Sequence, residues 1–153
     1  GSHIDLHCGD TGISRQYSLC GDPQQADTYE IAVLRDPTRG GVAAVLNEIA
    51  EASHCGVLID EDALPIREEV RGVCDILGFD PLYLANEGKC IAFVPAEEAD
   101  KVLAVMRENP YGKDACLIGE VTAEAPGQVG LRTAIGGIRI VDMPLGNLVP
   151  RIC

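Results

Sequence analysis

The chain ends in a cysteine, Cys153, which places a thiol and the terminal carboxylate on one residue. The residues before it include Pro144, Gly146 and Pro150, and such a segment is hard to pack as a helix or a strand. A tail of this kind is suited to carry a nucleophilic thiol into a distant pocket and out again. Residue type alone favours a simpler interpretation, in which Cys153 is an incidental residue of a loose terminus.

A second candidate site lies in a glycine-rich turn that precedes an expected helix. Gly40 and Gly41 let backbone amides approach a ligand closely, and a helix N-terminus favours an anion. Asp36 is a candidate magnesium ligand, Thr38 a hydroxyl donor and Arg39 a bidentate contact for phosphate oxygens. The local chemistry supports an ordinary strand-to-helix turn equally well, with Asp36 or Thr38 as the N-cap. It is not a Walker A loop, because the Gly-Lys-Ser/Thr ending is missing.

A third candidate site is the turn that holds Asn86, Glu87, Gly88 and Lys89. A glutamate in a tight turn is a candidate general base or metal ligand. On local grounds a solvated hairpin turn is the favoured interpretation. No metal centre is predicted from the histidines, because His54 beside Cys55 is more typical of a helix end.

The composition excludes several classes of partner. Asp and Glu number 24 against 12 Lys and Arg, which gives a net charge of −12. Such an acidic chain is not expected to bind nucleic acid or an anionic membrane surface, and its apolar stretches are too short to span a bilayer. Seven cysteines without a C-x-x-C pair are typical of a reducing compartment, so we expect a cytoplasmic protein.

The periodicity predicts an α+β fold, an α/β sandwich in which a mainly antiparallel sheet carries helices on one face. The expected helices are 42–52, 67–77 and 95–108. The expected strands are 29–35, 57–59, 82–84, 90–94 and 116–121, followed by a hairpin of 128–133 and 138–143. In the second helix, Val70, Val73, Cys74 and Leu77 keep helical spacing and are expected to face inward.

We divide the chain into four parts. Residues 1–3 have the composition of a tag remnant, and residues 4–29 are expected to be an irregular segment. Residues 30–145 are expected to form one domain, and residues 146–153 a mobile tail that ends in Cys153.

Three separated motifs resemble the HypE family of hydrogenase maturation factors. They are Asp-Pro-Thr-Arg-Gly-Gly-Val-Ala at 36–43, Ala-Asn-Glu-Gly-Lys at 85–89 and Pro-Arg-Ile-Cys at 150–153. The stretches 66–78 and 80–83 are similar to that family as well. The resemblance implies the fold of an AIR synthase C-terminal domain. It also implies an N-terminal domain with the ATP site and homodimer contacts, which we do not find here, so the chain is expected to be a domain fragment. An apolar patch is expected where the missing domain packs.

The resemblance implies that the thiol of Cys153 accepts a carbamoyl group from the partner HypF. An ATP- and magnesium-dependent carbamoyl dehydratase step then forms an S-cyano group, whose cyanide passes to the HypC–HypD iron carrier and becomes a ligand of the hydrogenase iron. Glu87 is the expected base, and Arg151 is expected to guide the tail. The residues implied in phosphate, magnesium or tail contacts are Asp36, Thr38, Arg39, Gly40, Gly41, Asn86 and Lys89. An alternative is a non-catalytic binding module that presents the tail to HypF or HypC–HypD.

Overall fold

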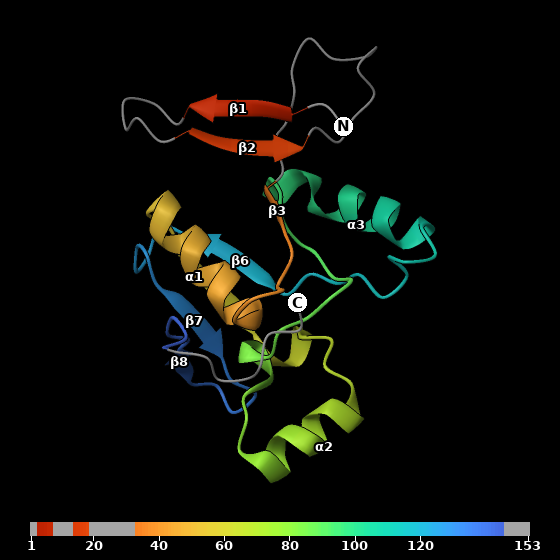
Figure 1. Ribbon diagram of the computed structural model, residues 1–153, viewed down its shortest axis with the longest axis vertical. Coiled ribbons are helices and arrows are strands. Elements are labelled where there is room, and N and C mark those ends of the chain that lie inside the picture. The colour runs from red at the N-terminus through yellow and green to blue at the C-terminus, as the bar shows by residue number, and fades with distance from the viewer. Residues whose placement is uncertain (1–2, 8–13, 19–32, 146–153) are drawn as a thin grey trace.

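The computed structural model describes the backbone of residues 3–7, 14–18 and 33–145, and the side chains of residues 34–145. Three strands come first in the described chain, helices and single strands follow, and three strands come last (Figure 1). None of the helices among these residues is long and apolar enough to cross a membrane. The predicted tail, with Arg151 and Cys153, lies outside the described residues.

The core forms between helix α1 and a four-stranded sheet. Helix α1 spans Gly41–Ser53, and the strands in sheet order are β6 (Gly119–Thr122), β4 (Gly56–Asp60), β7 (Val129–Arg132) and β8 (Ile138–Ile140). Strands β4 and β7 run parallel, and the two outer pairs are antiparallel. Leu46 of α1, Ile59 of β4 and Leu131 of β7 are buried together. This confirms the predicted mainly antiparallel α+β fold, the predicted helix 42–52 and the hairpin that follows residue 128.

A second, two-stranded sheet pairs β3 (Val33–Arg35) with β5 (Ile91–Phe93) in antiparallel register. These strands fall within the predicted strands 29–35 and 90–94, although residues 29–32 lie outside the described part. The predicted strand 116–121 begins only at Gly119, as β6.

The predicted strand 82–84 is wrong. Residues Pro81–Tyr83 form a 3₁₀ helix, η3, because the Asp80 carboxylate accepts a 2.9 Å hydrogen bond from the amide of Leu82. A proline at the first helical position adds to this start signal. The turn chemistry therefore overrides the apolar run.

Two further helices lie away from the four-stranded sheet. Helix α2 spans Glu68–Leu77 and lies beside η3, whereas η4 (Ala96–Glu98) leads into α3 (Ala99–Glu108) on the other side of the molecule (Figure 1). Only one of the four α2 residues expected to face inward is buried: Cys74 is 2% exposed, whereas Val73 is 56% exposed. Val70 and Leu77 are exposed as well, so this part of the prediction is wrong.

The segment 4–29, expected to be irregular, contains a hairpin. Strands β1 (His3–His7) and β2 (Ser14–Ser18) pair antiparallel (Figure 1). The alternation of apolar and polar residues through Ile4, Asp5 and Leu6 has the period of a strand, which accounts for the difference.

Candidate functional site

The two loops singled out in the sequence lie against each other. The backbone N–H of Asn86 donates a 2.9 Å hydrogen bond to the carbonyl oxygen of Pro37, and the Pro37 side chain is fully buried. The side-chain amide of Asn86 also donates to the Leu84 carbonyl at 2.7 Å. The loop that carries Asp36 and Thr38 is therefore fixed to the turn that carries Glu87.

The glycines between the first loop and α1 serve this contact. Gly41 has a φ of 66° and is buried against the backbone of η3 and of Leu84, the residue after it. An added Cβ at Gly41 would lie 2.6 Å from the Leu84 carbonyl oxygen and also meet the Leu82 carbonyl. The close approach that the sequence suggested for a ligand is thus made by the protein's own chain.

Gly40 brings a third segment to the same place. Its φ is 65°, and an added Cβ would lie 2.9 Å from Cγ of Pro144. Pro144 comes just before the predicted tail, so the two loops and the residues that precede the tail share one region of the surface.

The segment before the tail is held by hydrogen bonds from three elements. The N–H of Val141 donates to the Val129 carbonyl at 2.8 Å, and Nδ2 of Asn47 donates to the Val141 carbonyl at 2.9 Å. The hydroxyl of Tyr83 donates to the Asp142 carbonyl at 3.0 Å. We call residues 141–144 the tail root. Leu145, the residue that follows and the last one described, is 90% exposed.

Burial and the nearby Asp80 carboxylate raise the pKa of Tyr83. The phenol therefore stays protonated at neutral pH and remains a donor to the tail root. Asp80 itself forms a 2.5 Å ion pair with Arg139 of β8. Asn47, Asp80 and Tyr83 received no site role from the sequence, although the stretch 80–83 resembles the family, because the partners Val141, Arg139 and Asp142 lie far along the chain.

The charged residues of the first loop have a defined arrangement. The carboxylate of Asp36 accepts a short hydrogen bond from the Thr38 hydroxyl. This bond is the main cause that lowers the pKa of Asp36, so its side chain is ionised at neutral pH. Arg39 is exposed beside it, and Arg35 pairs with Glu48 of α1 at 2.8 Å.

The second loop places Lys89 on Asn86, through a 2.9 Å hydrogen bond from Nζ to Oδ1. Glu87 lies in the same turn, exposed, and no hydrogen bond to it is found among the described residues. The structure thus joins Asn86 to the first loop and Lys89 to Asn86, but does not enclose Glu87 in a pocket.

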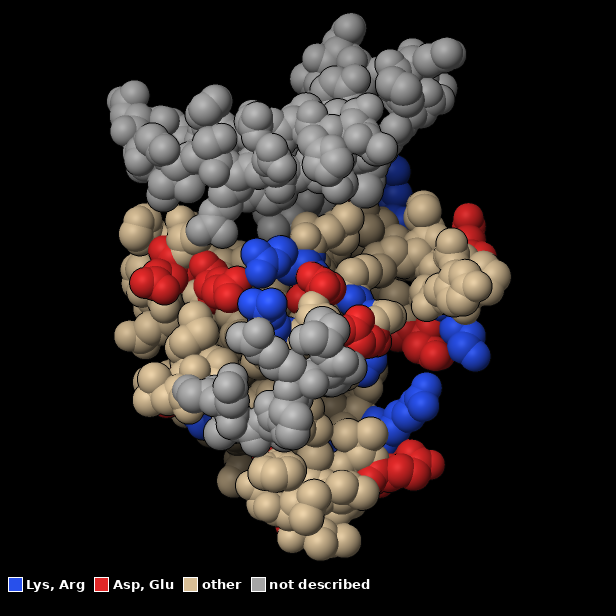
Figure 2. Space-filling model, in the orientation of Figure 1, with Lys and Arg blue, Asp and Glu red and all other residues tan. Residues whose placement is uncertain are grey.

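On the face that Figure 2 shows, the described residues form no area of a single charge sign. Basic and acidic side chains are interspersed across it (Figure 2). Among residues 34–145, no group of three or more His, Cys, Asp or Glu side chains lies close enough to hold a metal ion. Asp36 offers one carboxylate, and Mg²⁺ is usually held by one or two carboxylates together with substrate phosphates.

Comparison with known proteins finds the same family that the motifs resemble. Residues 14–132 match the family model for the C-terminal domain of AIR synthase related proteins, so the match begins inside the segment 4–29. The chain is 58% identical over 123 residues to a protein of Rhodobacter capsulatus named carbamoyl dehydratase HypE. That match covers 80% of this chain but only 36% of the relative.

Solved structures agree with this similarity. A crystal structure of the hydrogenase maturation protein HypE in complex with ATP matches with a TM-score of 0.72 and 53% identity, over 79% of this chain and 37% of that one. The structure of a HypE–HypF complex matches with a TM-score of 0.70 and 49% identity, over 73% of this chain and 36% of that one. The resemblance to HypE is therefore confirmed, and the chain spans little more than a third of each of these relatives.

Proposed function

Because the chain belongs to the family of AIR synthase related proteins, whose C-terminal domain it carries, we propose that it acts in hydrogenase maturation as the tail-bearing domain of a carbamoyl dehydratase. The observation that supports this most directly is the position of the tail root. Pro144 packs on Gly40 where the two loops meet, so the residues after it, up to Cys153, start from the candidate site.

The chemistry begins at the terminal thiol. As thiolate, Cys153 attacks the carbonyl carbon of an activated carbamoyl group, forming an S–C bond and releasing the activating group. Dehydration then requires that the carboxamide oxygen be phosphorylated by ATP and leave as phosphate. Two N–H protons leave in the same conversion, and an S–C≡N group remains. HypF is the proposed carbamoyl donor, because the solved structure of a relative is that of a HypE–HypF complex.

We assign the roles of this chain's residues as follows. Glu87 accepts protons from the carboxamide nitrogen, and Lys89 and Asn86 keep the turn of Glu87 in place. Because Glu87 is exposed, the carbamoylated tail or another part of the protein must cover it during the reaction to exclude water. Thr38 and Arg39 contact phosphate oxygens, and Arg151 guides the tail.

The described residues provide only part of an ATP site. The N-terminus of α1 has no side-chain cap and no acidic residue in its first turn, which suits an anion. However, Gly40 and Gly41 already pack against Pro144 and the Leu84 carbonyl. ATP contacts beyond Thr38 and Arg39 must then come from regions with no counterpart in this chain, and we derive no step through magnesium. Homodimer contacts and transfer of cyanide to HypC–HypD belong to the same proposal, as does a cytoplasmic location.

The alternative is a tail-presenting module without dehydratase activity of its own. Gly40 and Gly41 pack against Pro144 and the Leu84 carbonyl rather than facing a phosphate, and this favours the module for this chain alone.

Adding ATP to the carbamoylated chain and following its intact mass separates the two functions. Loss of one water that depends on ATP identifies the chain as a dehydratase. A carbamoyl group that stays on the chain identifies the module, provided that a full-length HypE relative dehydrates under the same conditions. A chain that never gains the carbamoyl group contradicts both functions.

A further inference from the structure

Helix α2 presents an apolar face that no described element covers. Val73 is 56% exposed, and Val70 and Leu77 on the same face are also exposed. Between this face and Leu84 lies an open groove of about 330 Å³. Its lining is almost wholly apolar, with Glu69 as the charged residue among Val70, Val73, Cys74 and Leu84. A groove of this kind on a folded domain indicates an interaction site.

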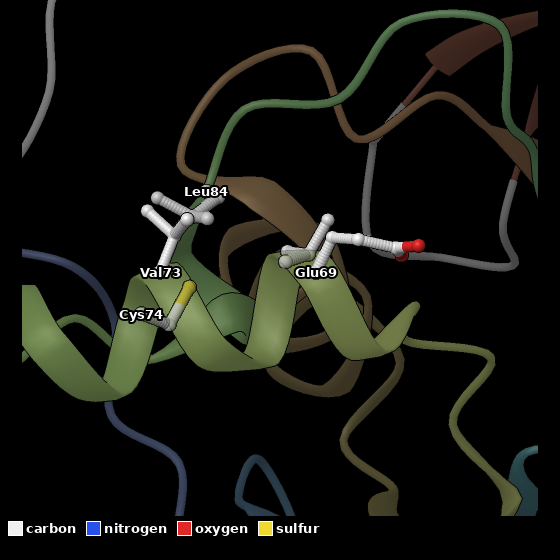
Figure 3. Close-up of a pocket in the computed structure, with 5 residues that line it drawn as sticks. Glu69, Val73, Cys74 and Leu84 are labelled. Carbon is white, nitrogen blue, oxygen red and sulfur yellow. The ribbon is translucent and has the colours of Figure 1, made fainter.

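The geometry points to the predicted tail of the same chain as the occupant: we propose that residues 146–153 dock in the α2 groove. Val73 points toward Leu84 across the groove, and the carboxylate of Glu69 extends away from Leu84 (Figure 3). The groove therefore has an apolar end at Leu84 and an acidic end at the start of α2.

The tail root lies next to the apolar end. Leu84 directly follows Tyr83, whose hydroxyl holds the Asp142 carbonyl at 3.0 Å. Pro144 and Leu84 pack against the neighbouring glycines Gly40 and Gly41. The eight residues after Leu145 extend about 27 Å when fully stretched, which is ample to follow one helical face.

The order of residues in the tail matches the order of features along the groove. Leu148 and Val149 come first and suit the apolar end between Leu84 and Val73. Arg151 follows and suits the acidic end, where Glu68 and Glu69 form the first turn of α2. When the tail runs from Leu84 toward the start of α2, its apolar residues meet the apolar end of the groove and its arginine meets the acidic end.

Docking at α2 goes beyond the proposed function, because a docked tail is not presented to a partner. It requires neither HypF nor ATP. A test of docking can therefore fail while the proposed chemistry stands, and the reverse also holds.

A disulfide trap tests the proposal in the full chain. Val149→Cys and Val70→Cys are combined in a Cys153→Ser background, and the oxidised protein is analysed by intact mass and peptide fragmentation. The matched control replaces Val70→Cys by Gly72→Cys, two residues away on the opposite face of α2, where an added side chain meets nothing within 4 Å. Both variants share the same tether, so the control accounts for random encounters of a tethered thiol.

We expect the bond between positions 70 and 149 to form roughly tenfold faster than the bond between 72 and 149. Arg151→Glu should slow the first bond several-fold and leave the control unchanged. Equal rates at positions 70 and 72 would overturn the proposal. A 70–149 bond found only between two molecules, at a rate that rises with protein concentration, would also overturn it and assign the groove to a second copy.

Discussion

The hydroxyl of Tyr83 donates a 3.0 Å hydrogen bond to the carbonyl oxygen of Asp142, which joins the η3 turn to the tail root. The turn that follows η3 is held to the first loop, through the Asn86 amide and the Pro37 carbonyl. The tail root and the two loops are therefore positioned as one unit, and substitutions within this unit test the account.

Tyr83→Phe removes the hydroxyl and leaves the Asp142 carbonyl without this partner. We expect a loss of about 1 kcal/mol in the free energy of unfolding, together with faster hydrogen exchange at the tail root. Urea unfolding and exchange mass spectrometry measure the two effects. Tyr111→Phe is the control, because Tyr111 is fully exposed. Equal results for the two variants would show that the Tyr83 hydroxyl does not hold the tail root.

Gly41→Ala tests the packing of η3 against the start of α1. Gly78→Ala is a matched control, because the φ angles are 66° and 70° and an added Cβ meets nothing within 4 Å at Gly78. The control should lose about 1 kcal/mol from backbone strain alone. Gly41→Ala should lose a further 1 to 3 kcal/mol, roughly, from the collision with the Leu84 carbonyl. Equal losses in thermal or urea unfolding would contradict the packing argument.

Thr38→Val tests the hydrogen bond that lowers the pKa of Asp36. A lowered pKa means that the bond stabilises the folded protein above the unfolded-state pKa, and that this stability is lost as the pH falls through the folded-state pKa. The difference in the free energy of unfolding between the parent and Thr38→Val should therefore be largest near neutral pH. It should fade in the acid range below the ordinary Asp pKa. NMR titration should show a higher pKa of Asp36 in the variant. An unchanged titration would rule out Thr38 as the cause.

Glu87→Gln tests the proposed base. Where the carbamoylated parent loses water on addition of ATP, Glu87→Gln should keep its carbamoyl group, because the amide cannot accept the nitrogen protons. Carbamoylation itself should proceed at the parent rate. Glu97→Gln, an exposed acid in η4, serves as the control. Intact mass follows the loss of water. Dehydration by Glu87→Gln at the parent rate would remove Glu87 from the mechanism.

Much of the fold could be predicted because its signals are local. The periodic apolar residues around Leu46 mark α1, and Gly136 marks the turn between β7 and β8. Local signals also explain the failures: Asp80 and Pro81 start a 3₁₀ helix where the apolar run suggested a strand. The exposed face of α2 has the same sequence pattern as a buried one, so periodicity alone could not reveal that Val73 lacks a partner.

The sequence predicted the separate loops of the candidate site, but not that they lie against each other. The types and spacing of Asp36, Thr38 and Asn86 marked the two loops, but their contact depends on the long-range topology. The same holds for Asn47 and Tyr83, whose partners at the tail root are 94 and 59 residues away in sequence. The roles of Cys153 and Arg151 remain proposals, since both lie outside the described residues.

The most direct test of the central claim is the mass of the chain after incubation with HypF, carbamoyl phosphate and ATP, with peptide mapping of the C-terminus. The account predicts an added carbamoyl group on Cys153, or the cyano group derived from it, and no addition to Cys153→Ser. A full-length HypE relative in a parallel reaction shows that the HypF preparation is active. A carbamoyl group on another residue, or an unmodified chain beside a modified relative, would contradict the claim that this tail is the acceptor.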